Sequence, residues 1–198
     1  MNKTLLSILG CLMLAAFVAG CGPDKSLSIT ERQKLVGDME TQTLQKLYTQ
    51  DAAAEAKVKN AAGYGVFANG NVNVILASFG GGYGVVVDNA TSQRTYMKMG
   101  TGGLGLGIGA KDYRQVFIFK TNEVLNKFVT SGWEFGGHAD AAAKAGESGG
   151  ALDAEGAIGK DIEVYSMTES GLALQATVTG AKYWKDDDLN PVKNTNEK

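Results

Sequence analysis

The apolar and polar residues of this chain follow two different periods, and the change comes near Tyr64. Between residues 28 and 61 the apolar residues recur mostly every three or four positions, the spacing of one helical face. They include Val36, Met39, Leu44 and Leu47. The run Ser28-Ile-Thr-Glu31 has the spacing of a capping box, and Gly63 supplies a stop signal. This stretch therefore predicts two helices, or one bent helix, at the start of the domain.

From Tyr64 onward, short apolar runs alternate with glycine or polar clusters, which is typical of antiparallel strands. Strands are predicted at residues 72–79, 82–87, 95–99, 104–109, 113–119, 161–166 and 172–178. The run Leu104-Gly-Leu-Gly-Ile-Gly109 carries branched residues on one face and only glycine on the other. A bare glycine face lets another layer approach closely, or lets the sheet coil tightly.

One helix is predicted to interrupt the sheet. Asn122 is placed to cap it, and Gly132 to end it. Its apolar residues are Val124, Leu125, Phe128 and Val129. Residues 133–145 mix helix-favouring alanines with aromatic and glycine residues, and we favour a strand there. The predicted fold class is α+β, with N-terminal helices packed on a glycine-rich, strongly curved or barrel-like antiparallel sheet that has one inserted helix.

The composition supports a sheet rich in glycine. Glycine supplies 27 of 198 residues, about twice its usual share, whereas proline occurs only twice. A disordered glycine-rich chain lacks apolar runs, and this chain has many of them. The glycines are therefore expected inside or between strands.

The first twenty residues have the layout of a secretory signal. Lys3 precedes an apolar run over residues 5–19, which is too short for a comfortable membrane span and ends in small residues. Val18-Ala-Gly-Cys21 resembles the lipobox of bacterial lipoproteins. The resemblance implies cleavage between Gly20 and Cys21, a diacylglycerol thioether on Cys21, and acylation of the new amino group. The alternative is an ordinary signal peptide with a chance cysteine after the cleavage site.

The processed chain is long enough for one domain. We expect a signal peptide at residues 1–20, a lipidated tether at 21–29, the domain at 30–190 and a polar tail at 191–198. Processing removes Lys3 and no acidic residue, which changes the formal net charge from −2 to −3. A chain with this balance is not built to bind nucleic acid. With Cys11 removed and Cys21 acylated, no thiol remains for a disulfide, a metal or nucleophilic catalysis.

The candidates for catalysis or metal binding are weak. Residues 105–110 fit a dinucleotide-binding GxGxxA string, but a strand follows them where that motif requires a helix. His138 is the single histidine; Asp140 shares its strand face, yet no serine lies in a nucleophile elbow. Asp186-Asp187-Asp188 lacks calcium-loop spacing and is expected to end the last strand and solvate the chain's exit. We predict no catalytic residue, no metal site and no cofactor.

Aromatic residues are the candidates for ligand contact. Tyr183 and Trp184 precede Lys185, a combination that suits lipid headgroup level, although a cluster closing the core is the alternative. The candidate ligand-binding residues are Trp133, Phe135, Tyr183 and Trp184.

Several segments together resemble the SYLF-domain family, in its bacterial lipoprotein branch. In family order, they are Ala62-Gly-Tyr-Gly-Val-Phe67, Phe79-Gly-Gly-Gly-Tyr-Gly-Val-Val86, Tyr96-Met-Lys98, residues 102–110, Val116-Phe-Ile-Phe119, residues 124–128, Val164-Tyr165 and Gly171-Leu-Ala-Leu174. The resemblance covers roughly residues 30–190 and implies lipid binding. Eukaryotic members bind phosphoinositides, partly through a basic N-terminal segment, and some bind actin. Residues 28–61 are electrically balanced instead, so these two activities transfer poorly.

The function predicted is a non-enzymatic domain that binds lipid or another apolar ligand and is tied to the bacterial envelope by acylated Cys21. Gly22 after the acylated cysteine resembles lipoproteins sent to the outer membrane, so the expected location is its periplasmic face. The main alternative is a structural or protein-interaction module of the envelope, with no lipid ligand beyond its own anchor and a partner that the sequence does not identify. An enzyme is the third hypothesis.

Overall fold

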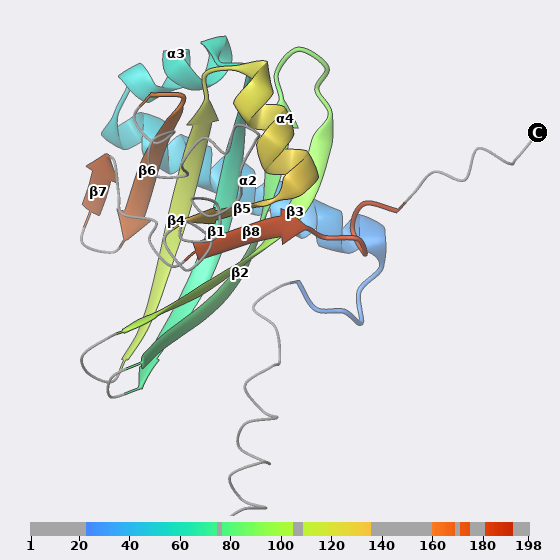
Figure 1. Ribbon diagram of the computed structural model, residues 1–198, viewed down its shortest axis with the longest axis vertical. Helices are drawn as coiled ribbons and strands as arrows, with labels where there is room; N and C mark the ends of the chain where they lie inside the picture. The colour runs from blue at the N-terminus through green and yellow to red at the C-terminus, as the bar shows by residue number, and fades with distance from the viewer. Residues whose placement is uncertain are drawn as a thin grey trace, which may run out of the picture.

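The computed structural model describes residues 23–74, 77–104, 109–135, 160–168, 171–174 and 181–191. Within these ranges two helices precede an antiparallel sheet, and a third helix is inserted before its last strands (Figure 1). The helices are α2 (Ile29–Gln50), α3 (Ala53–Asn60) and α4 (Asn122–Ser131). The strands are β1 (Gly63–Val74), β2 (Ala77–Asp88), β3 (Arg94–Leu104), β4 (Gly109–Phe119), β5 (Trp133–Phe135), β6 (Ile162–Thr168), β7 (Gly171–Leu174) and β8 (Ala181–Lys185). This arrangement confirms the predicted fold class.

The start of α2 follows directly from its sequence. Ser28 Oγ accepts a hydrogen bond from the Glu31 amide, and Glu31 Oε2 accepts one from the Ser28 amide, which completes the predicted capping box. The helix ends at Asp51, whose carboxylate accepts from the Ala53 amide as α3 begins. Of the two predicted arrangements, the separate helices are the correct one.

Gly63 does not stop a helix, contrary to the expectation from sequence. Ala61 is the C-cap of α3, and Gly63 is already the first residue of β1. A Cβ atom at this position would lie 2.4 Å from the Val87 carbonyl oxygen and 2.8 Å from a Leu125 methyl group. The glycine is therefore used for a close approach within the sheet.

Two of the predicted strands are wrong because the chain changes strand within them. Residues 72–79 span the end of β1 and the start of β2, which pair with each other from Val74 and Ala77 outward. Leu104 pairs with β2 and Gly109 with β1, so residues 104–109 join two strands that lie on opposite sides of the β1–β2 pair. Residues 105–108, with the bare glycine face, lie outside the described residues.

The inserted helix differs from its prediction only at its first residue. Thr121, one residue before Asn122, is the N-cap of α4, and its hydroxyl accepts from the Val124 amide. Gly132 ends the helix as expected, with a φ of 70°. The favoured strand then begins as β5 at Trp133, and residues 136–145 lie outside the described part of the chain.

The sheet curls strongly, and a contact between β8 and β4 demonstrates it. The described strands follow the order β5-β8-β3-β2-β1-β4-β6-β7, so three strands separate β8 from β4. In a flat sheet these two strands would lie about 19 Å apart. Yet the Tyr183 hydroxyl of β8 donates to Gln115 Oε1 of β4 at 2.7 Å, and the Tyr183 ring lies 4.8 Å from that of Phe67 on β1.

Apolar residues bury both faces of the curled sheet. We call the face covered by α2 and α3 the helix face, and the face covered by α4 the inner face. Buried residues of the helix face include Val36, Leu47, Val58, Val66, Val85 and Val116. Those of the inner face include Phe67, Phe117, Phe119, Phe128, Trp133 and Tyr183. Among the helices of the described ranges, none is long and apolar enough to cross a membrane.

Candidate functional site

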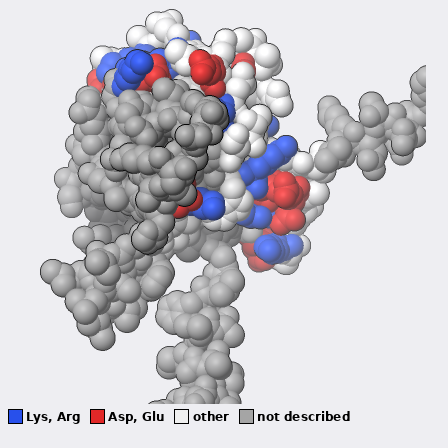
Figure 2. Space-filling view, in the orientation of Figure 1, with Lys and Arg blue, Asp and Glu red and all other residues white. Residues whose placement is uncertain are grey.

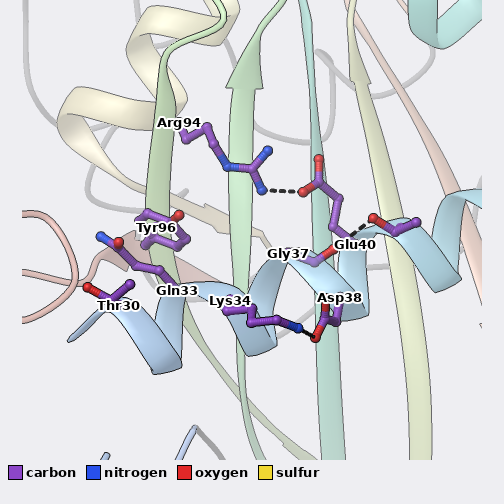
Figure 3. A pocket seen from close by; sticks show the side chains of 9 residues that line it. Thr30, Gln33, Lys34, Gly37, Asp38, Glu40, Arg94 and Tyr96 are labelled. Carbon is purple, nitrogen blue, oxygen red and sulfur yellow. Dashed lines mark hydrogen bonds and ion pairs between the residues drawn. The ribbon is translucent and has the colours of Figure 1, made fainter. Parts of the chain in front are cut away.

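A polar groove of about 470 Å³ lies between α2 and β3 (Figure 3). Helix α2 supplies most of its wall, and two residues of β3 supply the rest. The lining residues are Thr30, Gln33, Lys34, Gly37, Asp38, Glu40, Thr41, Arg94 and Tyr96.

Glu40 connects the groove to the sheet beneath it. Its side chain is buried, forms an ion pair with Arg94 of β3, and accepts a hydrogen bond from the Tyr64 hydroxyl of β1 at 2.8 Å. Burial and this hydrogen bond raise the pKa of Tyr64 above its ordinary value. A buried carboxylate needs partners of this kind, so Glu40 holds the helix on the sheet.

The charges that line the groove are paired. Lys34 forms an ion pair with Asp38 on the next turn of α2 at 2.6 Å, and Arg94 pairs with Glu40. The groove thus contains two basic and two acidic residues. This balance suits a neutral polar ligand better than a phosphate group, which favours unpaired basic residues.

The aromatic candidates lie in different environments. Tyr183 and Trp133 are buried in the inner-face cluster, and burial raises the pKa of Tyr183 well above its ordinary value. Trp184 is 39% exposed and lies over Gly100, where a Cβ atom would be 3.3 Å from its ring. The side chain of Phe135 lies outside the described part. Their assignment to a ligand site stays a prediction.

The acidic run after β8 is partly buried. It ends the last strand as expected, but Asp186 is only 3% exposed, forms an ion pair with Lys98 at 2.9 Å, and accepts from the Asp188 amide. The expectation that the whole run solvates the chain's exit is therefore wrong at Asp186. The described residues contain no group of three or more His, Cys, Asp or Glu arranged for a metal ion. His138 and Asp140 lie outside those ranges.

A polar network between α3 and β6 was missed in the sequence. Lys57 Nζ donates to Glu163 and, at 3.0 Å, to the Tyr165 hydroxyl, and that hydroxyl lies 3.1 Å from Asp51 Oδ2. The hydrogen bonds to Glu163 and Tyr165 raise the pKa of Lys57. The four residues are far apart in the chain, so no local signal marks the network.

Asn69 on β1 was also missed. It is buried on the inner face, and neither atom of its side-chain amide has a hydrogen-bond partner. Its cross-strand neighbours are Gly82 and Tyr113. A signal was present in the sequence, because asparagine recurs at alternate positions in Asn69-Gly-Asn-Val-Asn73.

The central strands continue past the described helices (Figure 1). We call the far ends of β1 to β4 the sheet tip; it consists of residues 70–74, 77–82, 100–104 and 109–110. The tip contains no Asp, Glu, Lys or Arg. Elsewhere, charged side chains of both signs lie intermixed near α3 and near the start of α2 on the face shown in Figure 2.

Comparison with known proteins gives two matches. Residues 100–192 match the family described as Ysc84, Las17-binding protein actin regulator. The chain is also 35% identical over 159 residues to Beta cell expansion factor A of Aeromonas veronii. That alignment covers 80% of this chain but spans only 59% of the length of the relative.

Proposed function

Because this chain carries a Ysc84-family (SYLF) domain, which is not an enzyme family, we propose that it is a membrane-anchored lipoprotein whose domain binds lipid. The observation that carries the proposal is the sequence Val18-Ala-Gly-Cys21, which lies just ahead of a folded domain. The described chain begins at Pro23, and α2 begins at Ile29. A lipid on Cys21 would hold the domain within a few residues of a bilayer.

Two features of the domain support a lipid ligand rather than an anionic headgroup. The groove beside α2 pairs its basic residues with acids, and the sheet tip is uncharged. Binding is therefore expected to depend on apolar contact with lipid more than on neutralising phosphates. The proposed location is the periplasmic face of the bacterial outer membrane, because Gly22 follows the lipidated cysteine.

A protein-interaction module of the envelope is the second candidate. Ile29 and Leu35 of α2 are 42% and 43% exposed, and large apolar side chains at the surface can serve as contacts for a partner. The family description names Las17 binding for other members, and no such partner is assigned to this chain.

The anchor is tested by replacing Cys21 with serine, with Cys11→Ser as the matched control. In cells fed a labelled fatty acid, the unsubstituted chain and Cys11→Ser should incorporate label and fractionate with detergent-extractable membrane. Cys21→Ser should do neither, because the thioether has no sulfur to form on. Retention of acyl label in Cys21→Ser would show that the anchor is assigned to the wrong residue.

The lipid ligand is tested separately by extracting the purified chain and identifying bound small molecules by mass spectrometry. Lipid beyond the acyl chains on Cys21 should copurify with the protein. If the extract contains only those acyl chains while a protein copurifies in a fixed ratio, the interaction module is the better reading.

A further inference from the structure

The strand register brings the four uncharged segments of the sheet tip side by side. Val74 at the end of β1 pairs with Ala77 at the start of β2, and Ala77 pairs with Leu104 at the end of β3. On the other side of β1, Asn73 pairs with Gly109 at the start of β4. The tip is thus one continuous four-stranded patch of sheet (Figure 1).

The two faces of this patch differ in composition. Successive residues of a strand belong to opposite faces, and directly paired residues share a face. One face therefore carries two rows of apolar or small residues, Ala110-Val72-Phe79-Gly102 and Val74-Ala77-Leu104. The opposite face carries Asn71-Gly80-Thr101 and Gly109-Asn73-Ser78-Gly103.

The apolar rows belong to the helix face. In β1 they continue the alternation of Val66 and Ala68, which are buried under the helices. The described helices lie over the body end of the sheet, and the four strands continue beyond them (Figure 1). An amphipathic patch of strand that extends past its covering helices has the composition expected of a surface that meets an apolar partner.

We infer that the apolar rows of the sheet tip insert into the outer layer of the lipid bilayer to which Cys21 ties the chain. This inference rests on the proposed function. A tether of residues 21–28 extends at most about 3.3–3.6 Å per residue, so the domain stays within about 30 Å of its anchor. The start of the described chain and the tip both lie below the helices in the view of Figure 1.

The chemistry of the tip selects the hydrocarbon region over the headgroups as its contact. A residue charge within the tip would oppose insertion, and none is present. The sequence between the tip segments, Ile75-Leu76 and Gly105-Leu-Gly-Ile108, is uncharged as well. Binding through apolar area alone depends little on salt, whereas headgroup binding by lysine and arginine weakens as salt is raised.

Single-cysteine labelling provides a direct test. In the lipidated chain Cys21 is blocked by its thioether, and signal removal eliminates Cys11, so an introduced cysteine is the one reactive thiol. An environment-sensitive fluorophore is placed at Val72→Cys and Phe79→Cys in the apolar rows, and at Asn71→Cys and Thr101→Cys on the opposite face. Thr49→Cys on exposed α2 is the control. Each lipidated chain is reconstituted in phosphatidylcholine vesicles.

Quenchers in the two phases then distinguish the faces. Spin-labelled lipid should quench the probes at residues 72 and 79 about threefold more than those at 71, 101 and 49, and aqueous iodide should show the reverse order. Equal quenching on both faces would overturn the inference. So would shielding of residues 72 and 79 from both quenchers, because that result indicates a second protein chain over the rows.

The same experiment separates this inference from the proposed function. If the chain floats with the vesicles but the tip probes do not respond, the anchor stands and insertion of the tip is wrong. If the chain does not float at all, the anchor itself fails.

An unanchored comparison removes any effect of the acyl chains. In the Cys21→Ser background, Val72→Asp should weaken partitioning onto phosphatidylcholine vesicles about tenfold, whereas Asn71→Asp should change it less than about twofold. Similar losses for both variants, or a steep salt dependence on anionic vesicles, would contradict insertion through the apolar rows.

Discussion

At the scale of single residues, the missing side chain of Gly84 decides how the inner face packs. A Cβ atom there would lie 2.3 Å from the Val66 carbonyl oxygen and 2.4 Å from Cδ1 of Phe67, much closer than van der Waals contact. The bare backbone of β2 therefore makes room for the Phe67 ring, which in turn meets Tyr183 across the curl. The curvature expected from a glycine-rich sequence depends here on a glycine outside residues 104–109.

Replacing Gly84 with alanine should destabilise the domain by about 1–3 kcal/mol, because overpacking forces either the ring or the β1 backbone to move. Gly37→Ala is the matched control. It lies within α2, where the nearest atom to a new Cβ is 3.8 Å away, so it should stabilise the domain by about 0.5–1 kcal/mol. Urea unfolding of both variants measures the difference. An unchanged midpoint for Gly84→Ala would mean that the Phe67 ring does not need the space.

At the scale of elements, α2 is held on the sheet by one buried carboxylate as well as by its apolar face. Glu40 joins Arg94 of β3 and Tyr64 of β1, two strands that are not neighbours in the sheet order. One helix residue thereby fixes α2 against two positions of the curled sheet.

Arg94→Met should cost about 1–3 kcal/mol of unfolding free energy, because it leaves the charge of Glu40 buried with fewer partners. Adding Glu40→Gln in the same chain should recover part of that loss, since the uncompensated charge is removed. Thermal unfolding of the single and double variants forms the comparison. If the double variant is less stable than Arg94→Met by the full cost of a second independent lesion, the two residues do not act as a pair.

The elements also show where the sequence was sufficient. The capping box at Ser28 was predicted correctly because both of its partners lie within one turn, and Gly132 ends α4 for a similarly local reason. The β1–β2 reversal was missed because residues 75–76 are isoleucine and leucine, which carry no turn signal. The link between Glu40 and Arg94 was not predictable, since only the folded sheet brings α2 and β3 together.

At the scale of the whole molecule, buried phenol groups set a limit on stability at high pH. The pKa values of Tyr64, Tyr165 and Tyr183 are raised from the ordinary value of 10.0, in each case chiefly by burial. A raised pKa in the folded state means that the neutral phenol is favoured there. The resulting contribution to stability is complete below about pH 10 and is lost as the pH rises toward the folded-state values.

The free energy of unfolding should therefore fall above about pH 10, with a slope of about 1.4 kcal/mol per pH unit from fully buried Tyr183 alone. Urea midpoints across this range, followed together with phenolate absorbance, provide the measurement. Tyr183→Phe should reduce the slope, and its phenolate signal should be missing from the unfolding step. A midpoint that stays constant to about pH 11 would contradict the burial of these hydroxyl groups.

The pairing of β3 with β8 has a consequence for how the chain reaches its folded state. The two strands are neighbours in the sheet, although β4, α4, β5, β6 and β7 all lie between them in the chain. Contacts between residues so distant in sequence give a high contact order, and such folds form in milliseconds to seconds rather than microseconds. The curl is complete only after residues 181–185 have been synthesised. A chain that folds this late stays extended long enough to be threaded through a membrane before its core forms.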